Sequence, residues 1–317
     1  MTQVDSESSS ASLSEAQEKM VYGHARQVAC ALVLFISAIT SGCATIPYRC
    51  KPDIERPDTL KLRDDEPQIE RGKPRAIIDG AGHYVFSLPS KLILWNWRVN
   101  NHRISPDSED AMRRYLGENG LRNVKVRLNQ YAPGGEYRRL FANKDVGWLA
   151  RYTLGVISVT IYTIFPERLF GGLIGGDHYN PYTNTISVYS DHPAILLHEA
   201  GHAKDFAQMD RKGSYAAMGL VPFVSLHHEG AATGDAIGYY VDKDYRTEQK
   251  NAYKILYPAY GTYVGGEAAA WFAGPIVYAA AVIGAIPGHI VGRIKAAGIK
   301  EEQGQPAPEE PDSADAR

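Results

Sequence analysis

The sequence predicts an α+β fold, with a small mixed sheet followed by a largely helical C-terminal half. Strand patterns occur at residues 124–128 and 184–190, before the point where helical patterns take over. From residue 193 onward, small and apolar residues recur at helical spacing. With 317 residues, the chain is long enough to bury a sizeable core.

The charge balance argues against one class of partner. The chain has 34 Lys and Arg against 36 Asp and Glu, a formal net charge of -2. It contains no block of basic residues of the kind that neutralises a phosphate backbone. We therefore expect no nucleic-acid partner.

Residues 1–43 are expected to precede the folded domain. Residues 1–19 are polar and Ser-rich, and we expect them to be dispensable, with translation beginning at Met20. From Met20 the chain has the pattern of a secretory signal peptide, with an apolar run at 28–39. This run is shorter than the ~20 residues of a membrane-spanning helix, so an uncleaved anchor is the less favoured alternative.

Cys43 ends the stretch "TSGC", which resembles a bacterial lipobox although Thr40 stands where leucine is usual. The resemblance implies that Cys43 is lipidated and that the protein is exported to the cell envelope. Ala44, in the sorting position, implies the outer membrane and a periplasmic orientation. Because Cys30 lies in the signal peptide, Cys50 would be the one free thiol, and any metal site would use His and carboxylate ligands.

The remaining chain divides by composition. Residues 44–75 are rich in Pro and charge from Cys50 onward, and we expect a tether there. Residues 76–299 are expected to form one folded domain. Residues 300–317 are acidic, Pro-rich and nearly free of large apolar side chains, which predicts a disordered tail.

The first half of the predicted domain alternates between helix and strand. Residues 105–120 have a helix start at Ser105 and a Gly stop at Gly120. Residues 124–128 alternate apolar and polar residues, which predicts a half-buried strand, and "APGG" after them predicts a turn. Residues 151–165 are β-branched and aromatic, which favours a strand or an apolar hairpin.

A loop rich in Gly, Asn and Pro is predicted before the strand at 184–190. Two charged residues in that loop, Asp177 and His178, are expected to serve the loop itself rather than a substrate. Asp191 can cap the next helix, and Pro193 suits its first turn. That helix is expected to end near Gly213.

The helix contains the stretch "HEAGHAKDF". Residues four apart lie on one helix face, ~5–6 Å apart, so His198 and His202 can direct their imidazoles at one metal ion. Glu199 lies about a hundred degrees around the helix, where its carboxylate can take a proton from water beside the metal. The spacing therefore predicts a metal site rather than two unrelated histidines.

The stretch "NPYTNTISVYSDHPAILLHEAGH" resembles the edge strand and active-site helix of the zincin metallopeptidases. The resemblance covers roughly residues 105–245, and HExxH is its specific element. It implies a zincin-like fold, one Zn²⁺ per chain and an edge strand that binds peptide substrate. The metzincin branch requires a glycine and a histidine where this chain has Asp205 and Gln208, so the gluzincin branch remains.

In that branch the third zinc ligand is a glutamate on a following helix. Glu229 lies 27 residues after His202 on a segment of small residues, and we predict it as the ligand. The family often has an aspartate four residues later, but this chain has Thr233 there and its nearest aspartate is Asp235. Asp235 is therefore predicted to contact one of the ligands or the transition state. The competing ligands are Glu267, Asp235, His227 and His228.

The implied reaction is peptide hydrolysis, with Glu199 activating a zinc-bound water and passing its proton to the leaving amine. A further donor to the oxyanion is expected from Tyr257, Tyr260 or Tyr263, and we give preference to the last two. The predicted partners are a peptide or protein substrate from the envelope and the membrane. A non-catalytic, metal-stabilised lipoprotein scaffold or holdase is the alternative function.

Residues 268–286 contain no charge over 19 positions and are followed by basic residues. Their length permits a membrane span, which would suggest an integral membrane protease. The Ala and Gly content and Pro275 favour instead a helix that is buried or lies at a membrane surface.

Overall fold

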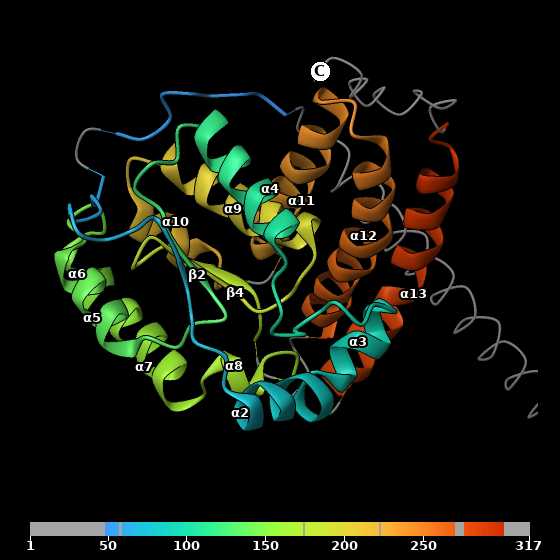
Figure 1. Cartoon of the computed structure of the whole chain (residues 1–317), viewed down its shortest axis with the longest axis horizontal. Coiled ribbons are helices and arrows are strands. Elements are labelled where there is room, and N and C mark those ends of the chain that lie inside the picture. Colours follow the sequence, from blue (N-terminus) through green and yellow to red (C-terminus); the bar gives the residue numbers. More distant parts are fainter. Residues whose placement is uncertain (1–47, 57–58, 174, 222, 270–275, 301–317) are drawn as a thin grey trace, which may run out of the picture.

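The computed structural model describes residues 48–56, 59–173, 175–221, 223–269 and 276–300. The expectations for Met20, for Cys43 and for the tail beyond Lys300 lie outside these residues. Within them the protein is a mixed α+β structure, as predicted. Helices surround one four-stranded sheet (Figure 1).

The sheet has the strand order β1-β2-β4-β3. β1 (Ile69–Arg71), β2 (Lys125–Leu128) and β4 (Thr185–Val188) run parallel, and β3 (His178–Asn180) pairs antiparallel with β4. The strands predicted at 124–128 and within 184–190 are confirmed. The predicted half-burial is wrong, because every residue of β2 is buried.

The position of the edge strand is a correction. The resemblance placed it at 184–190, but β4 lies inside the sheet, between β2 and β3. The edge is β3, in a segment predicted as loop. β3 has only three residues, which lie between glycines and a proline, and this is too short a pattern to predict a strand. Its extended conformation is stabilised by pairing with β4, in which Tyr179 lies opposite Ile186.

α4 (Pro106–Glu118) begins as predicted, with the Ser105 hydroxyl accepting a hydrogen bond from the Ser108 amide at 3.4 Å. The predicted cap at Asp191 is wrong. Its carboxylate accepts hydrogen bonds from the Ser105 amide at 2.9 Å and the Ser108 hydroxyl at 2.6 Å, so it joins two helix starts instead. The N-cap of the following helix is His192, without a side-chain hydrogen bond.

The segment from 133 to 170 is helical. It comprises α5 (Pro133–Ala142), α6 (Trp148–Ala150), a π-helical turn at Arg151–Gly155, α7 (Val156–Ile164) and α8 (Glu167–Phe170). The predicted strand or hairpin at 151–165 and the predicted turn at "APGG" are therefore wrong. Val159 of α7 packs with Leu140 of α5 in a small apolar cluster, and this packing outweighs the β propensity of the segment.

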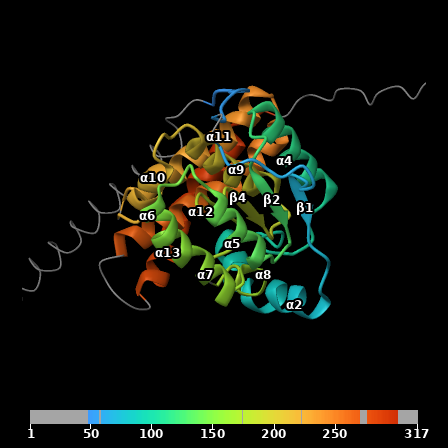
Figure 2. The same ribbon diagram turned by 90° about the vertical axis from the view of Figure 1, so that its left-hand side faces the viewer.

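The C-terminal half is helical, as predicted. It comprises α9 (Pro193–Ala207), α10 (Lys212–Met218), α11 (Ser225–Asp242), α12 (Arg246–Ala269) and α13 (Ile276–Ala297). Three shorter helices, α2 (Ala76–Ala81), a π-helix at Gly82–Phe86 and α3 (Leu88–Leu94), precede α4. α12 and α13 lie on the side of the molecule away from α5–α7 (Figure 1), and Figure 2 places β1 and α4 opposite α13.

The tether expected at 44–75 is corrected from Tyr48 onward. Ile54 is part of the main core, and residues 69–71 form β1. The Glu55 carboxylate accepts hydrogen bonds from Asn123, and the Tyr48 ring packs on Tyr239 at 5.5 Å between centroids. The proline and charged residues of this segment thus belong to an extended chain that follows the domain surface and adds β1 to the sheet.

α12 and α13 pack together through backbone contacts. A Cβ atom at Gly261 would overlap the carbonyl oxygen of Gly284, and one at Gly265 would overlap that of Ala280. Ala280 and Gly284 therefore serve close packing against α12, whereas Val282, Ile283 and Ile286 are exposed, so the described part of 268–286 is buried on one side only. In the described part of the chain, no helix has the length and apolar character required to cross a membrane.

Candidate metal centre

The site begins with the local geometry of α9 and its packing on α11. His198 and His202 lie one turn apart on α9, as their spacing predicts. Gly201 between them allows α11 to come close, because a Cβ there would lie 3.0 Å from the Ala232 Cα atom. This close packing brings Glu229, one turn before Ala232, beside the two histidines.

Three side chains converge at this point. The His198 Nε2 lies 3.1 Å from the His202 Nε2 and 3.1 Å from the Glu229 carboxylate. The other Glu229 oxygen lies 3.5 Å from the His202 Nε2. One ligand atom from each residue lies within 4.8 Å of the others, and this is the one such group of His, Cys, Asp and Glu in the described residues. The three residues can hold a metal ion.

The charges of the three side chains are coupled. Burial alone would raise the pKa of Glu229, but the two histidines outweigh it and hold the pKa well below its usual value. Burial would lower the pKa of His202, but Glu229 outweighs it and raises the pKa to about 9. Without a metal, His202 therefore holds a proton, and metal binding must displace that proton.

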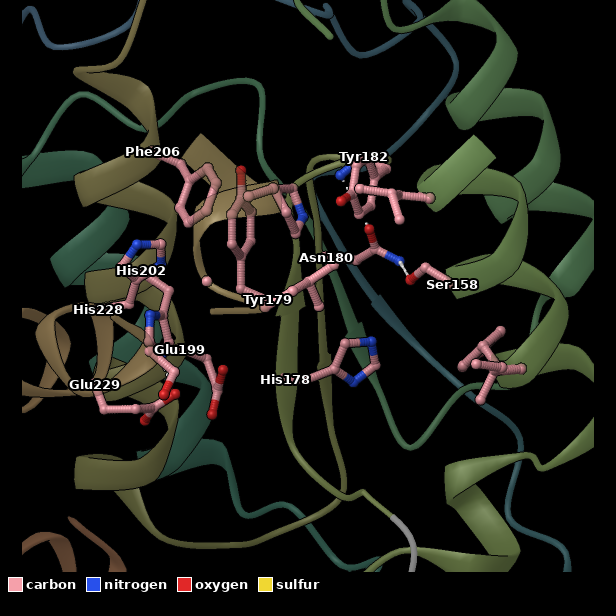
Figure 3. Close-up of a pocket in the computed structure, with 18 of the residues that line it drawn as sticks. Ser158, His178, Tyr179, Asn180, Tyr182, Glu199, His202, Phe206, His228 and Glu229 are labelled. Atoms are coloured by element: carbon pink, nitrogen blue, oxygen red, sulfur yellow. Dashed lines mark hydrogen bonds and ion pairs between the residues drawn. The ribbon is translucent and has the colours of Figure 1, made fainter. Parts of the chain in front are cut away.

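Glu199 lies at the same site with its side chain buried. Burial raises the pKa of Glu199, and the charges of His198 and His202 only partly offset the effect. Its carboxylate lines the cleft beside the three converging groups (Figure 3). A carboxylate with a raised pKa in such a place is suited to accept and return a proton.

Thr233 occupies the position where the family pattern led us to expect an aspartate. Its hydroxyl lies 3.2 Å from the His198 Nδ1. A hydrogen bond there fixes the orientation of the imidazole and leaves Nε2 directed at the other two groups. At this position a threonine hydroxyl, in place of an aspartate carboxylate, therefore contacts the ligand histidine, and the sequence interpretation missed this contact.

The Thr233→Val variant is expected to bind zinc roughly 10-fold more weakly, because it loses the hydroxyl at nearly constant volume. Competition with a chromophoric chelator measures the change. Thr163→Val is the matched control, since the Thr163 hydroxyl bonds only to the Val159 carbonyl of its own helix at 2.7 Å. Equal zinc affinity in both variants would contradict the role of Thr233.

A cleft of about 550 Å³ opens in front of the three groups. Glu199, His202 and Glu229 lie on one side of it, and β3 lies in the middle, between these residues and α7 (Figure 3). The far wall is α7, whose Ser158 hydroxyl accepts a hydrogen bond from the Asn180 side chain at 3.0 Å. Apolar side chains of the π-helical turn at Arg151–Gly155, of α7 and of the loop after α10 complete the walls: Leu154, Ile157, Ile161 and Leu220.

His178 faces the cleft from β3, opposite Glu199 (Figure 3). Its Nδ1 lies 2.7 Å from the Glu167 carboxylate. Burial alone would lower the pKa of His178, but Glu167 outweighs it and raises the pKa to about 9. We expected a loop function for His178, but the structure places its imidazole in the cleft, beside the Glu167 carboxylate. The role of His178 depends on its contact with Glu167 and on its place in β3. No pattern in the sequence predicted that contact or that strand.

The Asp177 carboxylate accepts hydrogen bonds from the Tyr189 amide at 2.6 Å and the Ser190 amide at 2.9 Å, which attach its loop to the chain after β4, and Asp177 also lines the cleft. Asp235 is not at the site. It pairs with the Lys204 ammonium at 2.6 Å and with the Tyr115 hydroxyl, so its predicted second-shell role is wrong.

Glu267 accepts hydrogen bonds from the Phe223 amide and the Ser225 hydroxyl at the start of α11, away from the three groups. His227 is exposed, and His228 stacks on Tyr215 at 4.3 Å. None of these three competitors belongs to the group of ligands.

Of the tyrosines, Tyr263 lines the cleft and is 44% exposed. The negative charge of Glu229, with those of Glu199 and Asp177, raises the pKa of Tyr263, so its hydroxyl stays protonated and can donate a hydrogen bond. Tyr260 is buried, and its hydroxyl donates to the Leu226 carbonyl at 3.4 Å. Tyr257 is buried among α12 and α13. Tyr263 is therefore the predicted donor best placed to reach a ligand.

Comparison with protein-family models, curated proteins and solved structures finds no match to this chain.

Proposed function

We propose that the protein is a zinc metallopeptidase of the zincin type, which hydrolyses peptide bonds of envelope proteins or peptides. The observation that supports this most is the convergence of His198, His202 and Glu229, of which His202 and Glu229 line an open cleft together with Glu199. Two imidazoles and one carboxylate match a ligand set of catalytic zinc, which leaves a fourth position for water or substrate. When bound, zinc polarises a carbonyl oxygen and lowers the pKa of water to ~7.

The protein's own residues divide the remaining work. Glu199 accepts the proton of the attacking water on its carboxylate and returns it to the leaving amine. β3 is an edge strand along the cleft, so an extended peptide can pair with it as a further strand. The Glu229 carboxylate and the two imidazoles hold the metal, and Thr233 holds the His198 ring.

Negative charge that develops on the substrate needs donors. His178 is held protonated by Glu167, and its Nε2 is the nitrogen that remains for a substrate because Nδ1 faces the carboxylate. Tyr263 offers a protonated hydroxyl from α12. Both residues line the cleft with Glu199, and donors aimed at developing charge contribute strongly to rate.

Membrane attachment belongs to the same proposal. Lipidation at Cys43 would place the enzyme in the periplasm at the outer membrane. This follows from the "TSGC" stretch and Ala44 alone, as in the sequence-based prediction.

The direct test uses the full chain, purified with added zinc, and a library of fluorogenic peptides. We expect one zinc per chain by mass spectrometry and hydrolysis that a chelator abolishes and zinc restores. Folded protein that takes up no zinc would refute the proposal. One zinc per chain without cleavage of any peptide would favour the non-catalytic scaffold.

A further inference from the structure

α13 has an unusual distribution of side chains. Its inner face packs on α12 through glycines, with a Cβ at Gly288 or Gly292 overlapping the backbone of α12. Its outer face is apolar, where a helix at the surface of a water-soluble protein is usually polar. The exposed fractions along this face are 62% for Ile283, 55% for Ile286, 56% for Ile290 and 67% for Ile294.

α3 extends this apolar surface. Leu92 and Trp95 are 59% and 66% exposed and form a shallow groove with Val282 and Ile286 of α13. We call these residues the α13 apolar face: Leu92, Trp95, Val282, Ile283, Ile286, Ile290 and Ile294. A contiguous exposed apolar surface of this kind marks a site that another surface covers.

Positive charge borders the α13 apolar face. Residues 276–297 include Arg293 and Lys295 but no Asp or Glu. The Arg293 guanidinium lies 4.6 Å from the centre of the Trp95 ring, which also stacks on His289 at 4.0 Å. Exposed isoleucines with a tryptophan and basic residues at their border are typical of helices that lie in a membrane interface.

Two other occupants fit less well. Residues 301–317 contain no large apolar side chain that could cover the isoleucines. In a symmetric contact through α13, a second copy would offer Arg293 no acidic partner from the same helix, because residues 276–297 contain no Asp or Glu. A surface with negative charge and an apolar interior meets both requirements.

We propose that the α13 apolar face docks on an anionic lipid bilayer. The isoleucines and Trp95 enter the boundary between headgroups and acyl chains, and Arg293 contacts anionic headgroups, whereas the Lys295 ammonium lies over the Tyr253 and Tyr257 rings of α12. The peptidase function does not depend on this contact, so either proposal can fail alone.

The test measures tryptophan fluorescence of the full chain in vesicles of phosphatidylethanolamine and phosphatidylglycerol with brominated acyl chains. Bromine is expected to quench the emission, and Trp95→Phe should remove much of the quenched part. Trp148→Phe should not, because Trp148 is equally exposed, at 70%, but lies on α6. Quenching that is unchanged in Trp95→Phe would overturn the proposal.

A double substitution, Ile286→Glu with Ile290→Glu, tests the isoleucines, with near-ultraviolet circular dichroism as the check of folding. We expect loss of bromine quenching. The matched control is Ile157→Glu with Ile161→Glu on α7, which are 55% and 52% exposed. An equal loss of quenching in both double variants would overturn the assignment to α13. A dimer of the wild type in analytical ultracentrifugation that only the α13 double variant abolishes would also overturn it. Equal quenching in zwitterionic vesicles would overturn the headgroup contact.

Discussion

Glu199→Gln is expected to lower the rate of peptide hydrolysis by roughly 10³-fold, within the range for loss of a general base. The amide has nearly the same size and keeps the packing of α9, but it cannot accept the proton of water. Glu199 is not among the three converging ligands, so zinc binding should remain. The measurement is kcat/KM on the best library peptide, with zinc content determined on the same sample.

Glu267→Gln is the matched control for this variant. The same change of a carboxylate to an amide there touches only the start of α11 and should leave the rate unchanged. Wild-type activity in Glu199→Gln would show that another group takes the proton. Loss of zinc in that variant would instead assign Glu199 to the metal.

Glu229→Ala is expected to abolish stoichiometric zinc binding. It removes one of three ligands, so the loss of affinity should exceed the roughly 10–100-fold seen for outer-shell partners. The Glu229 carboxylate also holds the His202 proton, and without it the pKa of His202 should fall from about 9, since only the charges of Glu199 and Asp205 then oppose the effect of burial. Zinc titration followed by mass spectrometry measures the first effect, and NMR titration of the imidazole measures the second.

Glu267→Ala separates the two glutamates that the sequence left in competition. It should keep one zinc per chain, because the Glu267 carboxylate contacts Phe223 and Ser225 rather than a histidine. Zinc lost in Glu267→Ala and kept in Glu229→Ala would redraw the site. The unfolding midpoint of both variants shows whether either change disturbs the fold as a whole.

Local patterns predicted a substantial part of this protein. The spacing of His198 and His202 places both imidazoles on one helix face, because helix geometry depends only on the chain itself. Ser105 and Pro106 fixed the start of α4 for the same reason. The strand β2 was predicted from its alternating apolar residues, but the burial of its polar residues was not.

Patterns failed where a distant segment decides the conformation. α7 is β-branched but helical, because it packs on α5. β3 exists through its pairing with β4. Residues 48–71 look like a charged tether, yet Ile54 reaches the core and β1 completes the sheet.

The sequence by itself determined the α+β class, the helical C-terminal half and the two histidines with Glu199 on one helix. Only the tertiary structure brought Glu229, the ligand predicted from the sequence, within reach of both histidines, gave Thr233 its contact with His198 and placed His178 and Glu167 at the cleft. It also left the isoleucines of α13 exposed. The physical reason is that helix periodicity is a property of neighbouring residues, whereas these contacts depend on how closely separate helices and strands pack, as Gly201 against Ala232 shows.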